Sequence, residues 1–103
     1  MLKYSLVELD DNLQILLKGD LDIESTEIIN DELIPKILNF NQVNLNFKNV
    51  PFVDSSGMGL LLALFHALAE SEIKITISNI RVDVFDIFEL LQIPDILGED
   101  TFV

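Results

Sequence analysis

The chain has 103 residues, of which 50% are hydrophobic, and it contains no cysteine and one histidine. This length and apolar content predict one domain, residues 1–103, and exclude intrinsic disorder. Its 18 acidic and 6 basic residues give a net charge of −12. So few basic residues exclude a protein that binds nucleic acid or anionic membranes through clustered cations. Because thiolates are absent and imidazole is scarce, we expect no disulfide, no metal site and no cofactor.

The chain shows no signal for export or membrane insertion. Its longest apolar stretch, Met58–Phe65, is well short of the roughly 20 residues that cross a bilayer. The first residues lack the charged region and apolar run of a secretion signal. We therefore expect a cytoplasmic chain with no direct membrane insertion, whose partner is a protein.

The first predicted elements are a hairpin and a helix. Residues 4–9 and 13–18 are short β-type runs on either side of an acidic turn, which indicates two antiparallel strands. Apolar residues then recur at helical spacing over residues 28–40, with Asp22 or Ser25 as the expected N-cap.

Strands and helices alternate through the middle of the chain. Alternating apolar residues predict strands over residues 43–47 and 72–78, and the helix-forming stretch 57–70 lies between them. Pro35 predicts a kink or a break in the preceding helix. Crossover connections of this kind imply a mixed sheet.

The C-terminal part predicts a third helix and the stub of a last strand. The helix is expected over residues 81–91, where apolar and acidic residues take opposite sides. Asn79 is its expected N-cap and Pro94 its expected end. Residues 101–103 are the expected strand stub.

The segment Pro51–Gly59, which reads PFVDSSGMG, joins the third strand to the second helix. Its two hydroxyls, Ser55 and Ser56, lie where the helix should begin, and the N-terminus of a helix favours anions. One interpretation is that Asp54 or a serine is simply an N-cap, with the glycines easing a tight turn. The other is that the serines have a function beyond capping.

An enzyme is the weakest interpretation of these serines. The one candidate base, His66, lies about 15 Å away along the same helix by helical rise and cannot touch Ser55. The Gly-x-Ser-x-Gly order is absent, and so is the lysine that a phosphate-binding loop needs. We therefore expect no catalytic residue and no enzymatic activity.

Helical indexing divides the second helix into two sides. One side is the predicted core, formed by Leu61, Leu64, Phe65 and Leu68. The other side carries smaller or polar residues: Gly59, Ala63, His66 and Glu70. This second side is either a shallow surface that a partner approaches, with Ser55 at its start, or an ordinary solvated face.

Three motifs in this order make the chain resemble a STAS domain, the fold of bacterial anti-sigma factor antagonists, from about Lys3 to Leu97. They are Gly19–Asp22 before the first helix, Val53–Gly59 at the entry to the second, and Phe85–Leu91 in the third. The resemblance implies an α/β fold class, a single-domain STAS-like fold. Its mixed four- or five-stranded sheet would carry about three helices packed mainly on one face.

The resemblance also implies a function in signal transduction and transcription regulation. In that family the first serine after the aspartate is the usual phosphoacceptor, which is Ser55 here, with Ser56 the second candidate. The unmodified form binds a serine kinase or anti-sigma-type partner, serine phosphorylation releases it, and a phosphatase resets the switch. The expected partner-binding positions lie near the phosphosite: Asp22, Asp54, Gly57, Gly59, Ala63 and His66.

The sequence departs from the family pattern in its second half. Gln92-Ile93-Pro94 replaces the usual glycine-containing turn, the 70–72 connection lacks the usual glycines, and the usual closing helix is not expected. This end also resembles STAS subunits of lipid-transport complexes, which lack the serine switch. The alternative function is therefore a constitutive subunit of a transporter or lipid-transport assembly, although the intact serine pair favours the switch.

Overall fold

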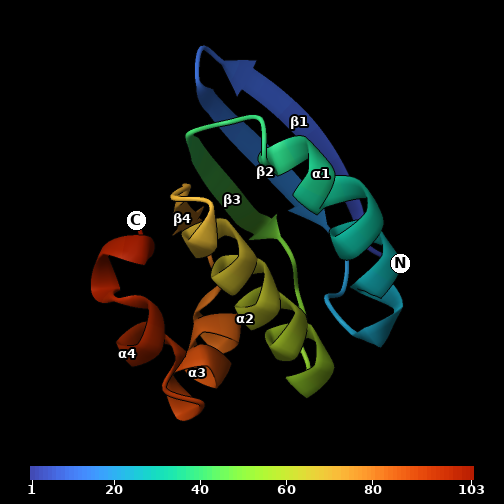
Figure 1. Ribbon diagram of the computed structural model, residues 1–103. Coiled ribbons are helices and arrows are strands. Elements are labelled where there is room, and N and C mark those ends of the chain that lie inside the picture. The colour runs from blue at the N-terminus through green and yellow to red at the C-terminus, as the bar shows by residue number, and fades with distance from the viewer.

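The computed structural model describes the backbone of residues 1–103 and every side chain except that of Glu99. A four-stranded mixed sheet forms its base, in the order β1-β2-β3-β4 (Figure 1). The strands are β1 (Lys3–Leu9), β2 (Asn12–Lys18), β3 (Gln42–Asn49) and β4 (Lys74–Ser78). β1 and β2 form the predicted antiparallel hairpin, and β3 is parallel to both β2 and β4. The predicted mixed α/β sheet is confirmed, with four strands.

The helices pack mainly on one face of this sheet, as predicted (Figure 1). The longest is α2 (Ser55–Glu70), which begins two residues earlier than expected and buries the predicted core side. Alternate strand residues point into the same core, among them Leu13, Ile15, Val43, Leu45, Phe47 and Ile77. The sheet and α2 therefore enclose a single apolar layer, which the period of two in the strands and the helical period in α2 both specify.

The first helical region is continuous through Pro35, but its hydrogen bonding changes on the way. It consists of the short turn η1 (Ile23–Ser25), the π-helical segment η2 (Ile28–Leu33) and α1 (Ile34–Ile37). Pro35 lies in the first turn of α1, directly after η2, and has no N–H to donate to a carbonyl of the preceding helical turn. The wider π-helical turns before it take the place of the expected kink or break.

A small polar cluster ties this region to the edge strand β1. The Tyr4 hydroxyl donates to Glu32 Oε1 at 2.7 Å and accepts from Lys36 Nζ at 2.8 Å. The hydrogen bond to Tyr4 raises the pKa of the exposed Lys36 ammonium. Because the cluster is exposed, it fixes orientation more than it adds stability.

The C-terminal elements differ most from the expectation. α3 (Val82–Leu90) has Arg81 as its N-cap without a side-chain hydrogen bond, so the assignment of Asn79 was wrong. Pro94 does not end α3. It lies in the first turn of a separate short helix, α4 (Ile93–Leu97), which gives four α-helices in place of about three.

The chain then returns to the sheet. After the turn η3 (Glu99–Thr101), Phe102 forms a single parallel bridge with Ile77, and the Val103 N–H donates to the Ile77 carbonyl at 2.9 Å. The expected strand stub at residues 101–103 is thus one bridge beside β4.

The two sides of α2 predict opposite responses to substitution. Leu61 is 2% exposed, so Leu61→Ala should lower the free energy of unfolding by about 2–5 kcal/mol through lost burial and a cavity. Ala63 is exposed, so Ala63→Ser should change it by less than about 0.5 kcal/mol. Midpoints of urea unfolding measure both, and equal losses at the two positions would contradict the assigned faces.

Candidate functional site

The candidate site lies where the segments that follow β2 and β3 run side by side. Leu21 and Val53 form a parallel bridge, and both side chains are fully buried. The Leu21 N–H donates to the Phe52 carbonyl at 3.0 Å, and the Leu21 carbonyl accepts from the Asp54 N–H at 3.3 Å. Asp22 and Asp54 each follow a bridge residue. The two acidic residues therefore leave the sheet at the same edge.

The Asp22 loop is held by reciprocal hydrogen bonds. A carboxylate oxygen of Asp22 accepts from the Glu24 N–H at 3.0 Å and caps η1, so the structure selects Asp22 from the two predicted caps, Asp22 and Ser25. The Ser25 hydroxyl accepts from the Asp22 N–H at 3.3 Å and donates to the Asp20 carbonyl at 3.3 Å. Since Ser25 is buried and satisfied, the loop has a defined shape next to the start of α2, which it contacts.

At the start of α2, Asp54 is the N-cap. Its carboxylate accepts from the Gly57 N–H at 2.8 Å, and its carbonyl accepts from the Met58 N–H at 2.9 Å. Ser55 is the exposed first residue of the helix, and its hydroxyl makes no hydrogen bond to any described residue, whereas Ser56 is half-buried. Of the two capping alternatives the structure selects Asp54, and it leaves the Ser55 hydroxyl available to solvent.

Gly57 lies on the buried side of the same turn. A Cβ atom at this position would lie 2.0 Å from the Leu21 carbonyl oxygen, which is closer than any side chain can approach. Gly57 therefore sets the distance between α2 and the Leu21 segment. Gly57 was expected among the partner-binding positions, but it is buried and offers no surface to a partner. Its role near the site is to allow this close packing.

The other expected partner-binding positions lie on the exposed side of α2. Gly59, Ala63 and His66 are all exposed, and together with Ser55 they follow one another at spacings of four, four and three residues. A Cβ atom at Gly59 would meet nothing within 4 Å. The His66 Nε2 atom lies 3.1 Å from Glu70 Oε1, and both side chains are more than two-thirds exposed, so this pair contributes little to stability.

Two apolar residues beside the site were missed in the sequence. Ile23, next to Asp22, is 66% exposed, and Phe52, two residues before Asp54, is 48% exposed. Large exposed apolar side chains next to polar ones are typical of protein contact surfaces. The sequence did contain a signal for them: neither residue fits the strand alternation or the helical spacing that predicts which neighbouring residues are buried.

Within the described part of the chain, no group of three or more histidine, aspartate or glutamate side chains is placed to hold a metal ion. None of the described helices has both the length and the apolar character needed to cross a bilayer.

Comparison with known proteins places this geometry in a family. The model of the STAS domain family matches residues 3–102. Among curated proteins, the anti-sigma-B factor antagonist of Bacillus subtilis is 19% identical over 88 residues, which span 85% of this chain and 81% of that protein. The antagonist of Staphylococcus epidermidis is 24% identical over 89 residues, with 85% and 82% covered.

Solved structures show the same fold. The anti-sigma factor antagonist SpoIIAA in its unphosphorylated form superposes with a TM-score of 0.76 at 23% identity, covering 98% of this chain and 86% of that one. Its phosphorylated form gives 0.72 at the same identity, with 98% and 89% covered. A sulfate transporter family protein from Wolinella succinogenes gives 0.82 at 14% identity, with 93% and 79% covered.

The two glycines of α2 form a matched pair for testing the packing of this site. Gly57→Ala should lower the free energy of unfolding by about 1–3 kcal/mol or more, because its methyl group meets backbone atoms that cannot move aside. Gly59→Ala should leave stability unchanged or raise it by up to about 1 kcal/mol, because alanine favours the helix. Thermal and urea unfolding measure the stability of both variants. Equal changes in the free energy of unfolding would contradict the contact between Gly57 and Leu21.

A second pair separates capping from any other role of the serine. Asp54→Ala should lower the free energy of unfolding by about 0.5–2 kcal/mol, because the Gly57 N–H loses its acceptor. Ser55→Ala should change it by less than about 0.5 kcal/mol, because the hydroxyl caps nothing. If Ser55→Ala lowers the free energy of unfolding more than Asp54→Ala does in the same urea series, the serine and not Asp54 is the N-cap.

Proposed function

Since the chain belongs to the STAS domain family, we propose that it is a phosphorylation-switched regulatory protein-binding module of the anti-sigma factor antagonist kind. In this proposal the unmodified form binds a serine kinase of the anti-sigma type or another regulatory partner. Phosphorylation of Ser55 releases the partner, and a phosphatase restores the unmodified form. The observation that carries the proposal is the Ser55 hydroxyl, which is exposed at the head of a 16-residue helix and free of any capping role.

The relatives support the same kind of function. The curated proteins from Bacillus subtilis and Staphylococcus epidermidis are anti-sigma-B factor antagonists. SpoIIAA, whose fold this chain shares, is itself an anti-sigma factor antagonist with an unphosphorylated and a phosphorylated form. Ser55 is the proposed acceptor because it is exposed and is the first serine after Asp54, and the half-buried Ser56 is the second candidate.

The local electrostatics explain how phosphorylation would switch binding. A phosphate adds about −1.5 to −2 charges at neutral pH. The first N–H groups of α2 can receive its oxygens, so the fold survives the modification. Asp22 and Asp54 already make the surface acidic, and the neutral hydroxyl is replaced by a strongly hydrated dianion. A partner that packs on the exposed side of α2 and on Phe52 would have to remove that hydration to bind.

The proposed activity is binding and not catalysis. No described residue accepts the proton of the Ser55 hydroxyl, and His66 is paired with Glu70 further along the exposed side of α2. A nucleophilic serine requires a base within hydrogen-bond reach. The expected absence of catalytic residues stays a prediction.

Substitutions at the two serines test the switch. Ser55→Ala should bind the partner constitutively, and Ser55→Asp should bind it weakly because a carboxylate places negative charge at the same point. Ser56→Ala is the matched control and should bind and release like the unaltered protein. Each variant would be used to capture partners from a lysate of the cells in which the protein naturally occurs. Circular dichroism would check the fold of each variant. Intact-mass measurement before and after phosphatase treatment would report its phosphorylation.

The outcomes separate the proposal from its alternative. Phosphatase treatment should lower the mass of the unaltered protein by one phosphate. If Ser56→Ala still shows this mass difference and Ser55→Ala does not, the result supports Ser55 as the acceptor. If all three correctly folded variants bind the same partner with the same affinity, the switch fails. The chain would then be a constitutive subunit of a transporter or lipid-transport assembly.

A further inference from the structure

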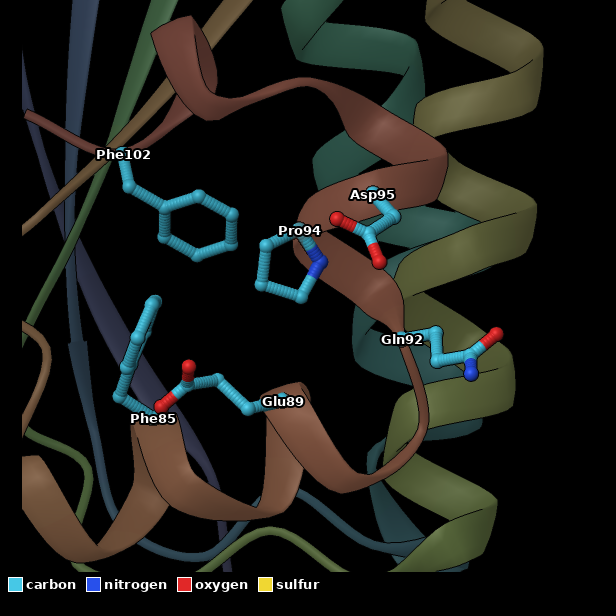
Figure 2. A pocket seen from close by; sticks show the side chains of 6 residues that line it. All are labelled: Phe85, Glu89, Gln92, Pro94, Asp95 and Phe102. Atoms are coloured by element: carbon cyan, nitrogen blue, oxygen red, sulfur yellow. The ribbon is translucent and has the colours of Figure 1, made fainter.

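A pocket of about 320 Å³ lies between the C-terminal elements of the chain (Figure 2). Its lining comes from α3, α4 and the bridge segment that returns to β4. The lining residues are Phe85, Glu89, Gln92, Pro94, Asp95 and Phe102. None of them belongs to the Ser55 site, so the pocket is a separate feature of the fold.

Two phenylalanine rings form one wall of the pocket (Figure 2). Phe85 and Phe102 are half-buried, and their ring centroids lie 5.3 Å apart at an interplanar angle of 81°. Phe102 also packs edge-on against Phe88 at 5.8 Å, and Phe88 is fully buried. The bridge to Ile77 fixes the backbone of Phe102. The wall therefore presents partly uncovered aromatic rings to the cavity.

Two carboxylates also line the pocket. Glu89 comes from α3 and Asp95 from the first turn of α4 (Figure 2). They face the same cavity because Gln92 takes a left-handed conformation, with φ of 58°, and reverses the chain between the two helices. Neither carboxylate forms an ion pair with a described residue. Residues 82–103 contain no lysine, arginine or histidine.

Large apolar side chains are also exposed on the helices that form the pocket and in the turn between them. Leu90 is 81% exposed, Leu91 is 48% exposed, and Ile96 is 63% exposed. Exposed aliphatic side chains close to polar ones are typical of a surface that another protein covers. A free metal ion or a small cation would leave these side chains in water.

We propose that this pocket binds an arginine side chain of a protein partner, with apolar residues of the partner covering the exposed leucine and isoleucine side chains of α3 and α4. An arginine guanidinium is planar, so it stacks on aromatic rings and donates hydrogen bonds to carboxylates. The pocket offers both kinds of group, since two aromatic rings and two carboxylates line it. The net charge of −12 also favours association with a basic segment.

The test uses the full chain labelled with ¹⁵N and a synthetic peptide with one arginine between leucines. A second peptide carries citrulline, which has nearly the same shape without the charge. We expect the arginine peptide to shift the amide resonances of α3, α4 and Phe102. The affinity of the citrulline peptide should be lower by a factor of about ten or more.

Two double variants with the same charge change locate the effect. Glu89→Gln with Asp95→Asn should weaken binding of the arginine peptide about tenfold or more. Glu8→Gln with Asp11→Asn, at the exposed hairpin end of β1 and β2, should leave it unchanged. Both pairs are exposed, and circular dichroism would verify their fold.

Three results would overturn the proposal: no shift at the pocket, equal binding of the citrulline peptide, or equal weakening in both double variants. The last result would mean that only the overall negative charge attracts the peptide. Because the test uses neither Ser55 nor its partner, its outcome is independent of the proposed phosphorylation switch.

Discussion

The close approach of α2 to the backbone at Leu21 is the constraint on which the rest of the structure depends. The Leu21 carbonyl accepts from the Asp54 N–H, and the Gly57 backbone lies so near it that no Cβ fits between them. This contact joins the loop after β2 to the start of α2, two segments that lie more than thirty residues apart in the sequence. It therefore explains physically why the Gly19–Asp22 and Val53–Gly59 motifs occur together in one chain.

The same contact decides which side chains of the first helical turn remain free. Because Gly57 is held against Leu21, its N–H points to the Asp54 carboxylate, which takes over the capping. Ser55, two residues before Gly57, is then turned to solvent with no hydrogen bond to make. An exposed hydroxyl at a fixed position on a rigid helix is the form in which a kinase can recognise a single serine. The buried side of the turn provides the rigidity, and the exposed side is left for function.

Local pattern was sufficient to predict much of this fold but not its irregular parts. Alternation located β3 and β4, β-type runs around an acidic turn located β1 and β2, and helical spacing assigned the buried side of α2. Burial imposes the strand and helix periods directly. The continuity of the helix through Pro35 depends on π-helical bonding, and α4 depends on a left-handed residue at Gln92; neither has a period to detect. In the candidate site, Asp22 was one of the two predicted caps, with Ser25. The choice of Asp54 over the serines, and the burial of Gly57, depend on the distant Leu21 carbonyl and could not be read locally.

The strong negative charge of the chain limits how a phosphate at Ser55 could act. Against a net charge of −12, two further charges change the long-range field only slightly, and salt screens that field over about 8 Å. Release of a partner would therefore depend on contact, through the hydration of the phosphate and the loss of a close fit to the first turn of α2. An effect of this short range would not extend to the pocket between α3 and α4, which shares no residue with the Ser55 site. The two surfaces could then bind different partners, and phosphorylation would control only one of them.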